Sequence, residues 1–421
     1  MDETPESSTT ADPAIVLPQL AELAQAAGRI ALDTEFMGEG RYRTLLCLIQ
    51  LAVADGADGE QIAIVDPLAG GRSDTGAETS GDGSPDGRFP ERGQPLARVL
   101  ADPLVEVVVH AGRQDISLLR RALGCEVTNV FDTQVAAGFL GMGAQCSYDT
   151  LLAEVLGVRL AKSASFTRWD ARPLSAEQLD YARGDVLHLS ALAIELQRRL
   201  EQAGRLRWAR EECEFLERVS DERDLERVFE RLPRIRGLSA SSQGIAQELV
   251  AWRERTAAER DRPVQSVLGD AALVEIAKRK PGSLRKLEEI RGIGQNSSRR
   301  RGEDLLAAVQ RGLRNEPRSL SSGPRPAQPQ ADDAPLIALA EALVRARARE
   351  ADVAYELLAS RADLQAIVVA RRERSDSHGA QEPDVRTLRG WRRELVGEEL
   401  LALLDGRVSL SVHGGRLQIG S

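Results

Sequence analysis

A strand that ends in two acidic residues constrains the fold of this chain more than any other feature. The apolar run Ile30-Ala31-Leu32 leads directly into Asp33-Thr34-Glu35. Side chains of a strand alternate between its two faces, so Asp33 and Glu35 point to the same side. The run itself predicts a buried strand, and a folded core does not ordinarily collect carboxylates at its edge. We therefore expect a site there that uses both acids.

A third acid follows another predicted strand. Residues 105–109 are valines apart from Glu106 and predict a strand, and residues 110–112 turn the chain into a predicted helix. Asp115 lies in the first turn of that helix, where the helix dipole favours a carboxylate. Taken alone, an acid at this position is more often a helix cap than a functional group.

A tyrosine and a fourth acid lie on a second predicted helix. Ser175 is the expected N-cap of this helix, with Gln178 as its capping-box partner. Tyr181 and Asp185 are four residues apart, so they share one face of the helix. Such a pair, taken alone, is more often a solvated helix surface.

Together, the three motifs predict a metal site. Divalent cations such as Mg²⁺ bind several carboxylate oxygens that converge from different elements. Two such ions roughly 4 Å apart can stabilise both the attacking and the leaving oxygen of a phosphoryl transfer. A strand end, a helix start and a second helix could supply the four carboxylates, and Tyr181 would place a phenol beside the ions.

These motifs, DTEF, HAGRQD and YARGDV, resemble those of the DEDD superfamily of 3′–5′ exonucleases, in the subclass with a tyrosine in the third motif. The connecting sequences CLIQLA, VFDTQVAA and RPLSAEQLDYA are similar to ribonuclease D. The resemblance implies an α/β ribonuclease-H-like domain, a mixed sheet flanked by helices, that removes nucleotides from RNA 3′ ends with two Mg²⁺ or Mn²⁺ ions. It implies that Asp33, Glu35, Asp115 and Asp185 bind the metals. Tyr181 matches the residue that orients the attacking water.

Two departures from the family pattern lie near the motifs. Ribonuclease D usually has Tyr-Tyr-Pro before CLIQ, whereas here Tyr42 precedes Arg43 and Thr44. The Asp-Trp pair that usually precedes the third motif is Arg168-Trp169 in this chain. Neither change falls on an expected metal ligand, so both concern substrate preference rather than activity.

The length of 421 residues predicts about three domains. Strands of the first are expected near 29–35, 45–53, 61–65, 105–109 and 127–131. The expected units are a disordered N-terminus 1–16, an exonuclease domain 17–219 with a flexible insertion 70–95, a connector 220–237, a helical domain 238–316, a linker 317–334 and a last helical domain 335–421.

The two C-terminal domains are expected to be small all-α bundles. The first resembles the domain that RecQ-type helicases share with ribonuclease D (HRDC), which implies nucleic-acid or protein binding, and the last resembles a second, more divergent copy. The whole chain carries a net charge of −9, but residues 233–314 hold 17 basic and 10 acidic side chains. This local excess predicts a contact with RNA phosphates, although a charged cluster is often just a solvated face. The candidate phosphate contacts are Lys278, Arg279, Lys280, Arg285, Lys286, Arg299, Arg300 and Arg301.

These observations predict a metal-dependent 3′–5′ exoribonuclease that acts on tRNA precursors or other structured RNAs with single-stranded 3′ ends. No apolar run reaches the roughly 18 residues of a membrane span, and the acidic start lacks the features of a signal peptide. A cytoplasmic monomer without membrane contact is expected, with a protein partner possible through the helical domains. Two alternatives are a DNA exonuclease in repair, which could use the same acids, and a catalytically silent RNA-binding adaptor, which would not need them.

Overall fold

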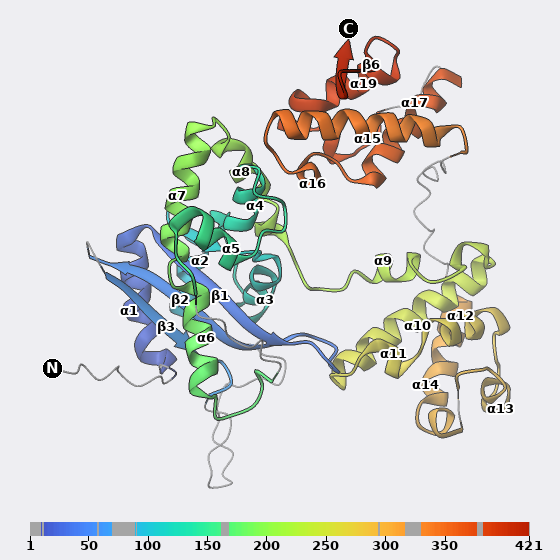
Figure 1. Cartoon of the computed structure of the whole chain (residues 1–421). Coiled ribbons are helices and arrows are strands. Elements are labelled where there is room, and N and C mark those ends of the chain that lie inside the picture. Colours follow the sequence, from blue (N-terminus) through green and yellow to red (C-terminus); the bar gives the residue numbers. More distant parts are fainter. Residues whose placement is uncertain are drawn as a thin grey trace.

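The chain forms a mixed α/β domain followed by two helical domains (Figure 1). None of the described helices is long and apolar enough to cross a membrane. The computed structural model describes residues 10, 12–56, 59–69, 89, 91–160, 168–293, 295–315, 330–376 and 382–420.

The first domain is built on one five-stranded sheet, in the order β3-β2-β1-β4-β5. The first three strands form an antiparallel meander, whereas β4 and β5 run parallel to β1. The mixed sheet expected from the sequence is therefore confirmed. The strands are β1 (Arg29–Met37), β2 (Leu45–Asp55), β3 (Gly59–Val65), β4 (Glu106–Val109) and β5 (Val130–Asp132).

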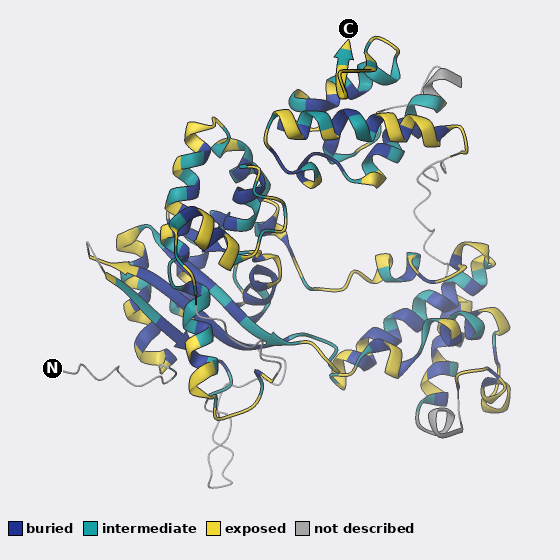
Figure 2. Ribbon diagram, viewed as in Figure 1, coloured by how far each residue is buried: buried dark blue, intermediate teal, exposed yellow. Residues whose placement is uncertain are grey.

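Alternation along β1 sends its side chains into two separate cores. Ile30 and Leu32 belong to the core between the sheet and α1, α2 and α3. Ala31 belongs to the core on the other face, with residues of α4 and α7. Figure 2 shows the strands buried beneath these helices. The helices of this domain are α1 (Pro13–Ala27), α2 (Gln94–Leu100), α3 (Arg113–Leu123), α4 (Thr133–Gly138), α5 (Tyr148–Leu151), α6 (Ala176–Val186), α7 (Leu189–Gln202) and α8 (Leu206–Cys213).

Two segments that were expected to be flexible contain residues of helices and of the core. Helix α1 begins at Pro13, inside the expected disordered residues 1–16, because Asp12 caps it by accepting a hydrogen bond from the amide of Ala14. At the other segment, 70–95, Phe89 is fully buried in the core and α2 begins at Gln94. The rest of that insertion, 70–88 and 90, lies outside the described residues.

The second domain is a helical bundle around its own core. Helices α10 and α14 pack along each other, and the other helices close the core around them. Residues 220–224 of the expected connector 220–237 carry no helix or strand, whereas Phe229, Leu232 and Ile235 farther along it are buried in this core. The helices are α9 (Leu225–Glu230), α10 (Ala240–Glu259), α11 (Val264–Val267), α12 (Asp270–Arg279), α13 (Leu284–Glu288) and α14 (Gln295–Arg314).

The loop between β1 and β2 connects the sheet to this helical bundle (Figure 1). The guanidinium of Arg41 pairs with the carboxylate of Asp261 at 2.6 Å, and the amide of Tyr42 donates to the same carboxylate at 3.1 Å. The ring of Tyr42 also packs against the core of the bundle. The strand that carries Asp33 and Glu35 is therefore continuous with a loop anchored on the second domain.

The last domain is helical and ends in a two-stranded antiparallel hairpin, which the sequence prediction of an all-α bundle did not include. Most of the linker expected at 317–334 lies outside the described residues, and the first helix of the domain begins at Asp333. The elements are α15 (Asp333–Glu350), α16 (Tyr355–Leu358), α17 (Arg361–Asp376), α18 (Gly390–Arg392), α19 (Glu398–Leu404), β6 (Ser409–His413) and β7 (Arg416–Gly420).

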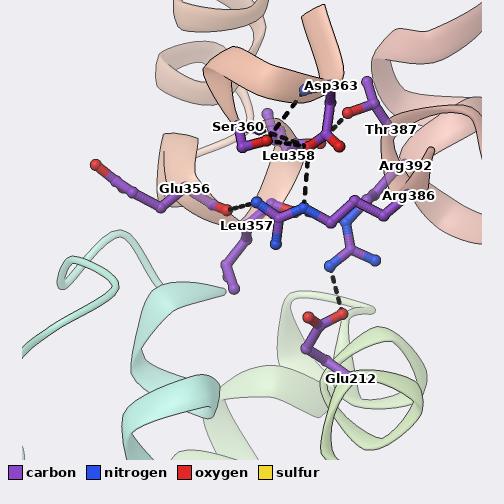
Figure 3. Close-up of polar contacts among 9 residues, drawn as sticks. All are labelled: Glu212, Glu356, Leu357, Leu358, Ser360, Asp363, Arg386, Thr387 and Arg392. Carbon is purple, nitrogen blue, oxygen red and sulfur yellow. Dashed lines mark hydrogen bonds and ion pairs between the residues drawn. The ribbon is translucent and has the colours of Figure 1, made fainter. Parts of the chain in front are cut away.

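This last domain is docked on the exonuclease domain by an aromatic cluster and an ion pair. The indole of Trp391 stacks on that of Trp208 in α8, with ring centres 5.3 Å apart, and meets the ring of Phe139 edge-on at 4.9 Å. Beside it, the guanidinium of Arg392 pairs with the carboxylate of Glu212 (Figure 3). Apolar residues of both domains share one buried cluster, so the interface is an extension of the domain core.

Candidate metal centre

Three of the predicted acids converge on one point. Asp33 and Glu35 come from β1, and Asp185 comes from the last turn of α6. One carboxylate oxygen from each lies within 4.8 Å of the other two. The alternation of β1 brings the first two together, as the sequence predicted. The capping box of Ser175 and Gln178, also predicted, fixes the start of the helix that supplies the third.

Carboxylates at this short separation repel one another, and their pKa values show it. Removal from water and the charges of neighbouring acids raise the pKa of Glu35 to about 8 and that of Asp185 to about 7. The same causes hold the pKa of Asp33 well above its ordinary value. The neighbouring charges that shift Glu35 and Asp185 are all carboxylates. A cluster of carboxylate oxygens that carry like charges is the chemistry that suits a hard divalent cation.

Asp115 lies beside this group but is held separately. It occupies the first turn of α3, as predicted, and its side chain is buried. One of its carboxylate oxygens accepts a hydrogen bond from the hydroxyl of Thr34, which lies between the two acids of β1. Burial raises the pKa of Asp115 to about 6, while the bond from Thr34 lowers it. The charge of Asp115 in turn raises the pKa of Asp33, as do the charges of Asp185 and Glu35.

Tyr181 lies one helical turn before Asp185, at the side of the acid group. Its ring packs next to Trp169, with ring centres 6.0 Å apart. Burial, followed by the charges of Asp185 and Glu35, raises the pKa of its phenol above the ordinary value. The hydroxyl therefore stays protonated at neutral pH and can both donate and accept a hydrogen bond.

Two further residues near the site were not singled out by the sequence. The charge of Asp149, in the first turn of α5, contributes to the raised pKa of Asp185. The phenol of its neighbour Tyr148 donates to the carbonyl of Leu187, two residues after Asp185. Both follow Ser147, which caps α5, so in sequence they read as an ordinary helix start. Only the packing of α5 against the α6–α7 corner reveals their place.

The predicted basic residues of the second domain are dispersed. Lys278, Arg285 and Lys286 are exposed on α12 and α13. Arg279 is also exposed and pairs with Glu275. Two others are engaged within the domain, since Lys280 donates to the hydroxyl of Ser241 and Arg301 donates to the carbonyl of Val267 at 2.6 Å. The side chains of Arg299 and Arg300 lie outside the described residues.

The fold and the acidic site define a class of nuclease, and comparisons with known proteins agree. The family model for a 3′–5′ exonuclease matches residues 9–201, and the model for an HRDC domain matches residues 242–309.

The particular family follows from whole-chain relatives. Ribonuclease D of Granulibacter bethesdensis is 36% identical over 400 residues, which cover 93% of this chain and 91% of that protein. Ribonuclease D of Nitrobacter hamburgensis is 35% identical over 405 residues, covering 94% and 97%. The crystal structure of Escherichia coli RNase D, described as an exoribonuclease involved in structured RNA processing, matches with a TM-score of 0.70 and 29% identity over 93% of this chain and 96% of that one. The chain belongs to the ribonuclease D family and is a 3′–5′ exoribonuclease.

Proposed function

We propose that this exoribonuclease binds two divalent cations, Mg²⁺ or Mn²⁺, at the four acids and hydrolyses the terminal phosphodiester bond at the 3′ end of RNA. The observation that carries this proposal is the convergence of Asp33, Glu35 and Asp185, whose carboxylate oxygens lie within 4.8 Å of one another, at a place where neighbouring carboxylates raise the pKa of Glu35 and Asp185. When bound, such ions make a water molecule a stronger nucleophile and stabilise the charge of the leaving oxygen.

Each acid has a distinct place in this proposal. Asp33, Glu35 and Asp185 would hold one ion, since their oxygens already converge. Asp33 and Asp115 would help to hold the second, since the charge of Asp115 raises the pKa of Asp33. Thr34 supports this division, because its hydroxyl donates to one oxygen of Asp115 and so fixes that carboxylate beside the two acids of β1.

Tyr181 orients the attacking water. Its phenol remains protonated because burial and the neighbouring carboxylates raise its pKa. A protonated phenol can donate one hydrogen bond and accept another, so it holds a water in a defined orientation without adding negative charge. Contact with Trp169 restricts the position of the ring.

The substrates proposed are tRNA precursors and other structured RNAs with single-stranded 3′ ends. The HRDC domain adds phosphate contacts through the exposed Lys278, Arg285 and Lys286. The acids of the site all come from one chain, which supports action as a monomer, and RNA as substrate supports a cytoplasmic location. A role for the helical domains in binding a protein partner is the alternative to RNA contact.

The test uses a 5′-labelled RNA and a DNA of matched sequence, each incubated with full-length enzyme and Mg²⁺, Mn²⁺ or EDTA. A ladder that shortens from the 3′ end of RNA, with either metal and not with EDTA, is expected. Equal or faster shortening of DNA would instead favour a DNA exonuclease. Degradation in EDTA would contradict the metal proposal.

A further inference from the structure

A buried amide beside the metal site has no hydrogen-bond partner among the described residues. Gln50 lies in the middle of β2 and is 0% exposed, yet neither its side-chain oxygen nor its nitrogen forms a hydrogen bond with any part of the chain that the structure describes. Buried polar atoms in native proteins nearly always have partners, because an unpaired one is destabilising. An amide that leaves both of its atoms unpaired in a core strand therefore calls for a ligand-dependent explanation.

The register of the sheet places this amide next to Asp33. Gln50 is paired with Asp33 on β1 and with Ile64 on β3. Paired residues of antiparallel strands extend to the same face, with Cβ atoms about 4.5–5.5 Å apart. Gln50 and Asp33 are therefore immediate neighbours on the face that carries the acids.

The other neighbours of Gln50 on this face are apolar. Along β2 they are Leu48 and Ala52, and across to β3 the neighbour is Ile64. Helix α6, which carries Tyr181 and Asp185, packs over the same strands. A glutamine is out of place in such surroundings unless it serves the acid beside it.

We propose that Gln50 is a positioning residue for Asp33, and that its amide N–H donates to a carboxylate oxygen of Asp33 when a divalent cation occupies the site. A carboxylate has two oxygens with several lone pairs, so it can bind a cation and still accept from the amide. An amide suits this position because it is neutral and fully shielded from water, whereas a carboxylate there would repel Asp33. This inference rests on the proposed function, in which Asp33 is a metal ligand.

The test compares Gln50→Met with Leu51→Met in the full-length protein. Methionine is close to glutamine in length but has no hydrogen-bonding N–H, so the metal-free variant should fold and melt at or above the temperature of the parent. Its affinity for Mn²⁺, measured by calorimetry without RNA, should fall about tenfold, as it does when a partner of a metal ligand is removed. Leu51 is paired with Leu32 and belongs to the core on the other face, so Leu51→Met should leave the affinity unchanged.

Two results would contradict the role of Gln50. One is an unchanged Mn²⁺ affinity of Gln50→Met. The other is a metal-free variant that unfolds or melts far below the parent, which would show that the amide supports the fold itself. Asp33→Asn in the same titration separates this inference from the proposed function. If Asp33→Asn binds Mn²⁺ normally, the metal assignment fails, whereas loss in Asp33→Asn with normal binding in Gln50→Met removes only the role of Gln50.

Discussion

The acids of the first domain and the bases of the second differ in how much their surroundings demand a function. Asp33, Glu35 and Asp185 are partly buried, and burial together with neighbouring carboxylates raises the pKa of each, so the metal-free fold is destabilised by holding these charges together. Lys278 and Lys286 are exposed, where a charge has almost no effect on folding. A strained cluster of like charges is strong support for a ligand, whereas an exposed basic surface is weak support. The predictions below test this contrast.

The largest effect is expected for the acids. Asp33→Asn or Asp185→Asn should lower the single-turnover rate on RNA by about 10³-fold, the scale of losing a group that stabilises transition-state charge. The metal-free variants should melt at or above the parent temperature, because one repelling charge is gone. Asp180→Asn, an exposed acid on the same helix, is the matched control and should retain full activity. Near-normal turnover of Asp33→Asn in saturating Mg²⁺ would contradict the view that the acids, unlike the exposed bases, are held together for a metal ligand.

The second largest effect is expected for the loss of the Tyr181 hydroxyl. Tyr181→Phe keeps the ring and its packing against Trp169 but loses the hydrogen bonds to water. The chemical step should slow by about 10²-fold while RNA affinity stays the same. Rapid-quench measurements under single-turnover conditions, made over a range of RNA concentrations, separate the rate of the chemical step from RNA affinity. An unchanged rate would make Tyr181 a packing residue only.

A smaller effect is expected for the basic surface. Each phosphate contact on single-stranded RNA contributes a slope of about −0.7 in log affinity against log salt. Changing Lys278, Arg285 and Lys286 together to Ala should therefore flatten the slope by up to about 2, without altering turnover at saturating RNA. Arg98→Ala, an exposed residue of α2 on the opposite face of the sheet, is the control for a general loss of charge. An identical slope in parent and triple variant would assign the HRDC surface to a protein partner.

The smallest effect concerns stability against pH. The folded pKa values of Glu35, Asp185 and Asp115, about 8, 7 and 6, lie above those of an unfolded chain. The folded state therefore binds more protons, and the stability that these groups contribute is lost as pH rises from about 5 through 8. Thermal midpoints of the metal-free protein should fall across this range by a few degrees, and Mg²⁺ should reverse the fall. In Glu35→Gln the thermal midpoint of the metal-free protein should fall less steeply with pH. If the difference between the metal-free and Mg²⁺-bound midpoints did not change with pH, the link between metal binding and the protonation of these acids would be contradicted.

The sequence could predict the acids because each lies at a fixed place in its own element. Strand alternation places Asp33 and Glu35 together, and a four-residue spacing does the same for Tyr181 and Asp185. Gln50 and Asp149 could not be found this way, because their nearness to the acids depends on strand register and on the packing of α5. The sequence could not place Phe89 and Phe229 in the core for a similar reason. Phe89 and Phe229 fall in segments that look like a loop and a connector, and only tertiary packing makes them core residues.

The stacked indoles of Trp208 and Trp391 provide a spectroscopic signal that depends on the docking of the last domain. Two of the four tryptophans of the chain lie face to face across the docked domains, 5.3 Å apart and 19° from parallel. Indoles in such an arrangement couple their transitions, and the resulting near-ultraviolet circular dichroism vanishes once they separate. This circular dichroism signal can therefore show, in unlabelled protein, whether the last domain stays docked on the exonuclease domain during RNA degradation. Trp208→Phe, which lacks the indole pair, is the control.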